Sequence, residues 1–426
     1  MDRPFDRVAL VVLDGVGCGQ AEDTGTEFPE DVGANSLVHA SQVKPIDAEA
    51  LRNIGLQQIP GLTGLQLIRQ TAWNHVRGAV GAIEPRFAGN GSPEGHQALM
   101  GHRVKTPYRL FNKTGFPPEL IARIEHKVEG VVGRPVKAIR YPETDDINGE
   151  KFFTHPSIGN VHYGSRDPSQ PFFLPIYASS DSLVQVALHL DVLPLEMMEA
   201  IARAIRTRAL VGEFANVARV ILRVWRGEPG KFERVSELRK DLGVNPDGLT
   251  LIDHLVEKGI SVFAVGKTAE MLNDRGFSEK RIKKGDTDDE RIMEVARRMR
   301  EEPDDRFVFA NLKYTDEKSG HKREPGLYVD HIEAASRGIG AVIQAMGQRD
   351  LLVVTSDHGN DPTHPNHTNH TRECSPLLVY SPRMIKPVEL GVRESHADVA
   401  ATLAEIFGVE DRIGEGTSFL RELLAA

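Results

Sequence analysis

Short apolar segments alternate with longer amphipathic stretches over much of the chain. The apolar segments are rich in Val, Leu and Ile, end abruptly in polar or glycine-rich residues, and cover 8–13, 260–265, 307–312 and 351–355. Segments of this length and composition predict strands that are buried on both faces. Apolar residues at helical spacing predict helices over 288–301 and 331–346. The alternation indicates an α/β fold whose mainly parallel sheet is flanked by helices.

The middle of the chain has a different pattern. Helical spacing after a pair of prolines predicts a helix over 118–128, and a second amphipathic helix is expected over 195–210. Residues 141–171 are polar and rich in Gly, Pro, Ser and Asp, which predicts mostly loop, and residues 226–230 must turn. We therefore expect a smaller α+β domain, over 105–244, inserted between core segments 1–104 and 245–426.

Composition and charge narrow the class of protein. Of the 426 residues 40% are hydrophobic and 27% are charged, as in ordinary globular proteins of about two or three domains. The net charge of −9 argues against nucleic acid as a partner, because such binders need a basic surface. The chain has two cysteines, Cys18 and Cys374, which is too few for a disulfide framework. This low cysteine count favours the reducing cytoplasm as the location of the protein. No apolar run approaches the roughly 18–20 residues of a membrane span, so we expect no membrane partner.

Candidate chemistry gathers near the ends of the predicted strands. Asp14, Asp316 and Asp357 each follow a predicted strand, and six of the 16 histidines lie between residues 321 and 370. In open α/β sheets, ligands bind beyond the carboxyl ends of the strands. The three carboxylates are therefore expected to converge on one place.

Convergent aspartates repel one another unless a positive group lies among them. Carboxylates together with the imidazoles of His321, His358 and His370 suit divalent ions such as Mn²⁺ or Zn²⁺. Six donors exceed what one tetrahedral ion requires, so we predict a two-metal site. Taken singly, each of these residues could instead be a helix cap or a surface histidine. Such incidental or supporting roles are expected for the remaining histidines of this region, His331, His364 and His367.

A second group of polar residues lies over 89–96. Ser92 precedes Pro93, which predicts a helix with Ser92 as its N-cap and proline at its first position. A helix N-terminus also binds anions, and a serine beside a metal ion can ionise and attack phosphorus. The sequence leaves both interpretations of Ser92 open. The glycines of 15–19 lack the spacing of a dinucleotide-binding loop, and no P-loop pattern is present.

These motifs together resemble those of the phosphopentomutase family within the alkaline-phosphatase-like metalloenzyme superfamily. The resemblance extends over most of the chain and rests on the segments 13–17, 33–37, 95–96, 100–101, 106–108, 115–117, 179–182, 219–221, 227–234, 266–267, 316–321, 357–363 and 370–373. It implies an alkaline-phosphatase-like core with an inserted cap domain.

The resemblance also implies roles for individual residues. One Mn²⁺ ion would be held by Asp316, His321 and His370, and a second by Asp14, Asp357 and His358. Ser92 would stand where the family has a phosphorylated threonine. Residues that would bind the substrate phosphate are Arg219, Arg234 and Lys267, and those near the sugar are Ser179 and Asp181.

The sequence departs from the family pattern in three places. The nucleophile is serine, and Asn90-Gly91 replaces the usual Lys-Asp before it. One extra residue separates His358 from His370. The stretch expected for sugar recognition is not recognisable, and residues 140–146 stand in its place.

The expected function is a cytoplasmic phosphomutase that interconverts ribose or deoxyribose 1-phosphate and 5-phosphate. The phosphate would pass through a phosphoserine and a sugar bisphosphate, which also serves as primer. A metal-dependent phosphatase or phosphodiesterase, and a mutase of another sugar phosphate, are the alternatives because the sugar-recognition stretch differs. A non-catalytic metal- or ligand-binding protein is a third hypothesis, which would leave Ser92 without a role in any activity.

Overall fold

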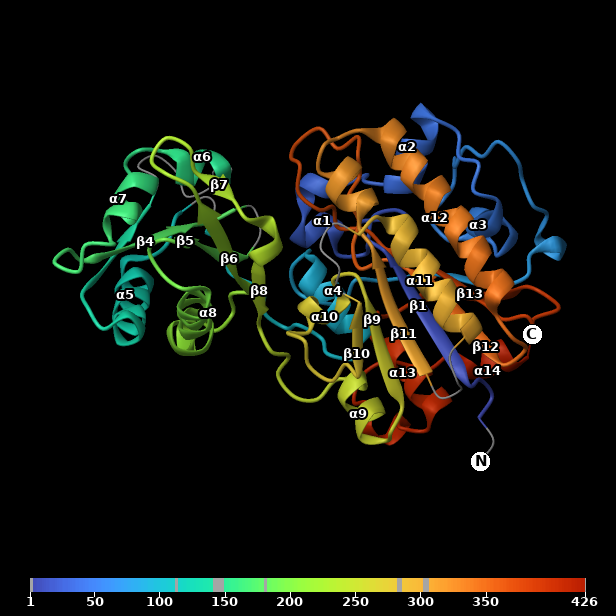
Figure 1. The fold of residues 1–426 in the computed structure, drawn as a ribbon. Helices are drawn as coiled ribbons and strands as arrows, with labels where there is room; N and C mark the ends of the chain where they lie inside the picture. The colour runs from blue at the N-terminus through green and yellow to red at the C-terminus, as the bar shows by residue number, and fades with distance from the viewer. Residues whose placement is uncertain are drawn as a thin grey trace. The chain divides into compact units, whose positions relative to one another are not determined.

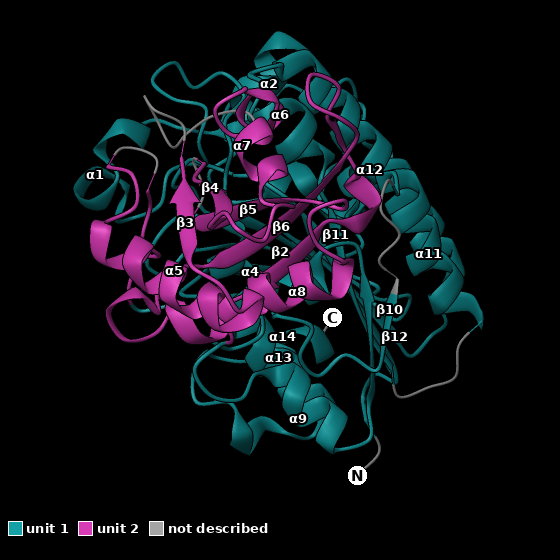
Figure 2. Ribbon diagram, turned by 60° about the vertical axis from the view of Figure 1, so that its left-hand side comes forward, with its two compact units in different colours: residues 1–105, 246–426 teal, residues 106–245 magenta. Residues whose placement is uncertain are grey.

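The structure is a computed structural model that describes residues 3–111, 114–140, 149–179, 182–281, 286–301 and 306–425. The chain divides into two compact units (Figure 2). Unit 1 comprises residues 1–105 and 246–426, and unit 2 comprises residues 106–245. The sequence predicts these limits at 104/105 and 244/245.

Unit 1 is built on a sheet of eight strands in the order β10-β9-β11-β1-β12-β13-β2-β14. Figure 1 shows β9, β11 and β1 side by side in this sheet. The strands are β1 Arg7–Leu13, β2 Ala79–Ile83, β9 Ser261–Val265, β10 Glu279–Arg281, β11 Arg306–Leu312, β12 Asp350–Thr355, β13 Ser375–Tyr380 and β14 Val388–Arg393. All neighbours are parallel except β13, which is antiparallel to both β12 and β2. The four predicted strands are confirmed as β1, β9, β11 and β12.

Helices pack on both faces of this sheet because its strands are apolar on both sides. The helices of unit 1 are α1 Thr24–Glu27, α2 Ser36–Val43, α3 Glu49–Asn53, α4 Ser92–Leu99, α9 Leu251–Glu257, α10 Thr268–Met271, α11 Asp288–Glu301, α12 Pro325–Ala345, α13 Ala397–Phe407 and α14 Leu420–Leu424. In β1, Ala9 and Val11 pack in one hydrophobic core with α2, α3, α11 and α12. Leu10 and Val12 pack in a second core with α4, α9, α13 and α14. The predicted helix 288–301 matches α11, whereas the one over 331–346 begins earlier, at Pro325.

Unit 2 has its own sheet and core. Its strands, β3 Val136–Ile139, β4 Phe172–Tyr177, β5 Leu183–His189, β6 Arg219–Arg226 and β7 Glu233–Arg234, lie in that order, and β8 Lys240–Gly243 pairs with β6. Parallel pairs (β3 with β4, β5 with β6) are combined with antiparallel ones. The helices α5 Pro118–Val132 and α8 Leu195–Ala204 bury their apolar faces in the core of this sheet. The predicted helix 195–210 changes to π-helical turns over Ile205–Ala209.

The prediction of mostly loop over 141–171 is wrong for part of the segment. Two short helices form there, α6 Gly149–Thr154 and α7 Gly159–Gly164, while 141–148 lie outside the described residues. Phe152 and Phe153 are fully buried in a cluster of aromatic side chains around Trp225. Burial of these side chains stabilises helical turns that the polar composition of the segment conceals.

In the ranges that the structure describes, no helix has the length and apolar character needed to cross a membrane.

Candidate active site

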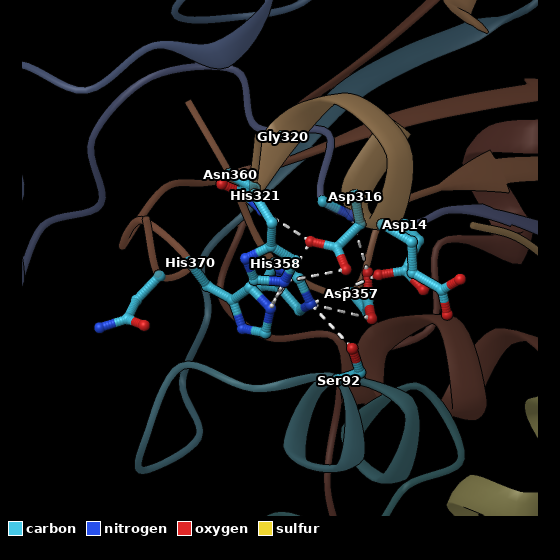
Figure 3. Close-up of polar contacts among 12 residues, drawn as sticks. Asp14, Ser92, Asp316, Gly320, His321, Asp357, His358, Asn360 and His370 are labelled. Atoms are coloured by element: carbon cyan, nitrogen blue, oxygen red, sulfur yellow. Dashed lines mark hydrogen bonds and ion pairs between the residues drawn. The ribbon is translucent and has the colours of Figure 1, made fainter. Parts of the chain in front are cut away.

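Three carboxylates converge at the carboxyl ends of three neighbouring strands in unit 1 (Figure 3). Strand β1 lies between β11 and β12, so the loops that follow the three strands are adjacent. Asp14 directly follows β1, Asp357 lies two residues after β12, and Asp316 lies in a π-helical turn, Thr315–Gly320, after β11. All three side chains are buried. The predicted convergence of strand-end carboxylates is thus present in the structure.

Two of the predicted histidines adjoin Asp316. His321 Nε2 lies 3.3 Å from Asp316 Oδ2, and His370 Nε2 lies 3.5 Å from Asp316 Oδ1. The two Nε2 atoms are 3.2 Å apart. These distances bring together the three residues that the resemblance assigns to one ion.

The third histidine stands between the two sets of ligands. His358 Nε2 lies 3.5 Å from Asp14 Oδ1 and 3.3 Å from Asp357 Oδ2. Its ring also stacks on that of His370, with 3.7 Å between ring centroids. The donor atoms of Asp14, Asp357 and His358 form one group with metal-ligand spacing, and those of Asp316, His358 and His370 form another. Both groups contain His358, so they lie next to each other, and the one lone pair of its Nε2 atom could bind an ion of only one group.

The donor atoms are suited to cations. Asp14 Oδ1 and Asp357 Oδ2 are buried and have no hydrogen-bond partner among the described residues. A buried carboxylate oxygen without a partner is costly unless a cation pairs with it. Mixed imidazole and carboxylate donors select divalent transition ions. The residues therefore fit a divalent metal.

Burial and neighbouring charges act differently on the three carboxyls. Burial, followed by the nearby charge of Asp357, raises the pKa of Asp14 to about 6. Burial also disfavours ionised Asp316 and Asp357, but adjacent imidazoles outweigh it, so the pKa of each lies below its ordinary value. Burial opposes the charged form of His358, yet the surrounding carboxylates raise its pKa. The net effect is a pocket that attracts positive charge.

One cation of the chain itself lies beside these carboxylates. Lys267, which follows β9, places its Nζ atom 2.7 Å from Asp14 Oδ2 and 3.9 Å from Glu317 Oε1. Burial disfavours the ammonium form, but Asp14 and then Glu317 outweigh it and hold the pKa of Lys267 above its ordinary value. The residue predicted to bind the substrate phosphate thus lies at the same carboxyl edge of the sheet.

Ser92 does not cap its helix, so that interpretation is wrong. Helix α4 begins at Ser92, and its N-cap residue is Gly91, which has no side chain to cap the helix. Ser92 Oγ instead forms a hydrogen bond with His358 Nε2 at 3.0 Å (Figure 3). The hydroxyl therefore lies next to the ligand cluster and at a helix N-terminus, where anions are favoured.

Three further residues orient the predicted ligands, and none of the three has a role predicted from the sequence. Asn311 Nδ2 donates to Asp14 Oδ2 at 2.9 Å, and Asn360 Nδ2 donates to Asp316 Oδ1 at 2.7 Å. His96 Nδ1 lies 3.2 Å from Asp357 Oδ2. Such contacts fix the orientation of metal ligands. The sequence could have indicated these residues only by their position, because each lies within a few residues of a predicted metal ligand or of Ser92.

The remaining predicted substrate residues belong to unit 2. Arg219 begins β6 and lies 3.9 Å from Asp241, while Arg234 in β7 lies 3.5 Å from Glu150. Both arginines thus make ion pairs within their own unit. Ser179 follows β4 and is partly buried, and Asp181 lies outside the described residues. The structure gathers the predicted ligands, Ser92 and Lys267 within unit 1, whereas these four residues are assigned to substrate by the resemblance alone.

The fold and the carboxylate–imidazole cluster define an alkaline-phosphatase-like metalloenzyme. The model of the Metalloenzyme superfamily matches residues 6–411. The PH0037 protein from Pyrococcus horikoshii shares the fold, with a TM-score of 0.50 and 12% identity over 95% of this chain and 98% of that chain.

Curated relatives identify the family within this class. A phosphopentomutase from Thermotoga maritima is 33% identical over 97% of this chain and 98% of its own length. One from Deinococcus radiodurans is 36% identical over 98% of this chain and 100% of its own length. The chain therefore belongs to the phosphopentomutase family and is an isomerase of the phosphomutase type. The superfamily and the groups of candidate ligands indicate a divalent metal as its cofactor.

Proposed function

We propose that this chain interconverts the 1-phosphate and 5-phosphate of ribose or deoxyribose, with Ser92 as the nucleophile. The observation that carries the proposal is the position of Ser92 Oγ, 3.0 Å from His358 Nε2 within the ligand cluster and on the first turn of α4. The curated phosphopentomutases among its relatives support the choice of substrate.

Two divalent ions, Mn²⁺ in the first instance and Zn²⁺ or another ion as alternatives, are part of this proposal. The residues that would hold one ion are Asp316, His321 and His370, and those that would hold the other are Asp14, Asp357 and His358. When bound, the ions would lower the pKa of the serine hydroxyl and stabilise negative charge on the phosphoryl group.

Phosphate would move in two balanced transfers. A sugar bisphosphate primes the enzyme by giving one phosphoryl group to Ser92 Oγ. Phosphoserine then gives its phosphoryl group to the free hydroxyl of a sugar monophosphate: the new P–O bond forms as the bond to Oγ breaks, and the hydroxyl proton is lost from the sugar as the freed Ser92 Oγ regains one. The resulting bisphosphate returns its other phosphoryl group to Ser92 and leaves as the isomeric monophosphate. The positive end of α4 stabilises the phosphorylated side chain.

Cationic side chains would hold the phosphate that is not being transferred. Lys267 is proposed for this role in unit 1, and Arg219 and Arg234 in unit 2, where Arg223 and Arg239 also lie near Asp241. Arginines bind phosphate through paired, charge-assisted hydrogen bonds. Ser179 and Asp181 are proposed to contact the sugar. Unit 2 would act as a cap that closes during the reaction and excludes water.

Phosphorus-31 NMR on the purified protein tests the proposal. With Mn²⁺, ribose 5-phosphate and a trace of sugar bisphosphate, we expect a ribose 1-phosphate resonance that is absent from Ser92→Ala. Ser92→Thr, which keeps a hydroxyl at this position, should retain activity, and mass spectrometry should find phosphate on the peptide containing residue 92. Steady release of inorganic phosphate without the isomer would identify a metal-dependent phosphatase instead. Wild-type activity in Ser92→Ala would overturn the assignment of the nucleophile.

A further inference from the structure

A third cluster of ligand-type side chains lies in unit 1, and none of its members belongs to the site described above. It consists of Asp31, at the end of a short 3-10 turn (Pro29–Asp31), and of His364 and His367, in the loop that leads to His370. Asp31 Oδ1 lies 2.8 Å from His367 Nε2 and 3.6 Å from His364 Nε2. The two imidazole rings face each other with 4.3 Å between centroids.

Hydrogen bonding accounts for only part of this cluster. The 2.8 Å contact between His367 Nε2 and Asp31 Oδ1 is an ordinary hydrogen bond, and Asp31 Oδ2 accepts a bond from the backbone N–H of Arg372 at 2.8 Å. His364 Nε2, in contrast, is buried and has no hydrogen-bond partner among the described residues. Its side chain is 6% exposed and directs this nitrogen towards Asp31. A buried polar atom of this kind needs a further partner.

The donors have the chemistry of a metal site. Two imidazole nitrogens and one carboxylate oxygen form a set that zinc sites use, with water completing the coordination. Ligand atoms about 2.0–2.1 Å from a tetrahedral ion lie roughly 3.3–3.4 Å apart, and the two observed separations from Asp31 Oδ1, 2.8 and 3.6 Å, lie on either side of this value. Burial, followed by the neighbouring His367, lowers the pKa of His364, which favours the neutral imidazole that binds metals.

We propose that Asp31, His364 and His367 form a third metal site, separate from the two-metal centre, that binds one divalent transition ion of the Zn²⁺ type. An ion here would join two segments that are more than 300 residues apart in the sequence. We assign it a structural role, because the side-chain polar contacts of its three ligands, in the described part of the chain, join them to one another and to the backbone N–H of Arg372.

The site would stabilise the loop that carries His370. Arg323 already holds this loop, through hydrogen bonds from its guanidinium to the carbonyl oxygens of His367 and Asn369. On the other side, His370 Nδ1 bonds Asn90 O at 2.7 Å, next to the segment that leads into α4. An ion bound by His364 and His367 would therefore fix the position of His370 from a distance.

Metal content per chain is the direct test. The full-length protein is stripped with chelator, reloaded with Zn²⁺, freed of excess ion and analysed by mass spectrometry of the metal. We expect about three ions per chain in the wild type and about two in His364→Gln and in His367→Gln. The matched control is His39→Gln, because His39 also bonds a buried aspartate, Asp361, at 2.6 Å but belongs to no group with metal-ligand spacing among the described residues. This variant should keep about three ions.

A second variant separates this site from the proposed two-metal centre. The double substitution Asp14→Asn and Asp316→Asn removes carboxylates from that centre, and we expect it to retain about one ion, which is lost when His364→Gln is added. With Co²⁺ in place of Zn²⁺, the retained ion should give the visible absorption of a four-coordinate site. Equal metal content in the wild type and in both histidine variants, or no bound ion in the double variant, would overturn the third site while leaving the proposed mutase activity unaffected.

Discussion

Replacement of Gly95 by alanine should damage the active site, although alanine has the higher helix propensity and Gly95 lies in a helix. Gly95 is in α4, one turn after Ser92. A Cβ atom at this position would lie 2.2 Å from the carbonyl oxygen of Asp357 and 2.7 Å from its carbonyl carbon. Both of these are backbone atoms, so a change of side-chain rotamer cannot relieve the overlap. Either α4 or the segment after β12 must move.

The size of the effect follows from this overlap. Ordinary contact of a carbon with an oxygen requires roughly 3.3 Å, so the two segments must separate by about 1 Å. The displacement acts directly on the bond between Ser92 Oγ and His358 Nε2 and on the contact of His96 with Asp357. A misplacement of about 1 Å costs roughly 100-fold in rate. Overpacking against backbone costs about 3 kcal/mol, of which the better helix propensity of alanine recovers about 1 kcal/mol.

We therefore expect Gly95→Ala to lose about 100-fold or more of its mutase activity and about 2 kcal/mol of stability. Activity is measured by phosphorus-31 NMR, and the free energy of unfolding by denaturant titration. The control is Gly340→Ala in α12, where the nearest atom to an added Cβ, Ala50 Cβ, lies at 3.5 Å, an ordinary contact. This variant should gain up to about 1 kcal/mol and keep full activity. Wild-type rate and stability in Gly95→Ala would refute the reasoning.

Two further predictions concern buried charges near the ligands. Lys267→Met leaves Asp14 without its ammonium partner, so the metal-free protein should lose about 3–5 kcal/mol of stability, and added Mn²⁺ should restore part of this loss. The second prediction concerns Glu373, a buried carboxyl whose pKa is raised to about 7 by burial and then by Asp361. The folded protein therefore retains a proton that the unfolded chain releases near pH 4.5, so wild-type stability should fall as the pH rises from about 4.5 to 7 and then level off. Glu373→Gln should lack this contribution of about 3 kcal/mol.

Each of these variants has its own control. Lys313→Met removes an ammonium that lies 2.7 Å from Glu317 in a more exposed position, and it should change metal-free stability by less than about 1 kcal/mol. An equal loss in both lysine variants would contradict a special role for the pair of Lys267 with Asp14. For Glu373, the free energy of unfolding is compared between the wild type and Glu373→Gln at several pH values. Parallel profiles between pH 5 and 8 would show that this carboxyl does not titrate differently on folding.

The core strands and the helices α5, α8, α11 and α12 could be predicted, apart from their exact ends, because their signals are local. Each of β1, β9, β11 and β12 is a short apolar segment whose own side chains require burial on both faces. The amphipathic spacing of α11 is complete within its own residues. The sequence also shows that an aspartate follows each of three predicted strands. Because parallel strands end at the same edge of a sheet, these aspartates are predicted to lie at that edge.

Other features required contacts that are distant in the sequence. The antiparallel course of β13 follows from its pairing with β2, almost 300 residues earlier. The short helices α6 and α7 depend on aromatic packing against Trp225. Ser92 bonds His358 in a region where α4 lies close to the segment after β12, and a Cβ atom at Gly95 would collide with that segment.

By itself, the sequence determined the α/β core and the kinds of chemical group that gather at the edge of its sheet. The reason is that hydrophobic periodicity and the ends of strands depend on residues that are close together in the sequence. Only the tertiary structure decided which of these groups meet. It placed Lys267 on Asp14, Asn311 and Asn360 behind the carboxylates, and His364 and His367 on Asp31. Such contacts depend on how separate elements pack against one another, and this packing cannot be inferred from any one segment of the chain.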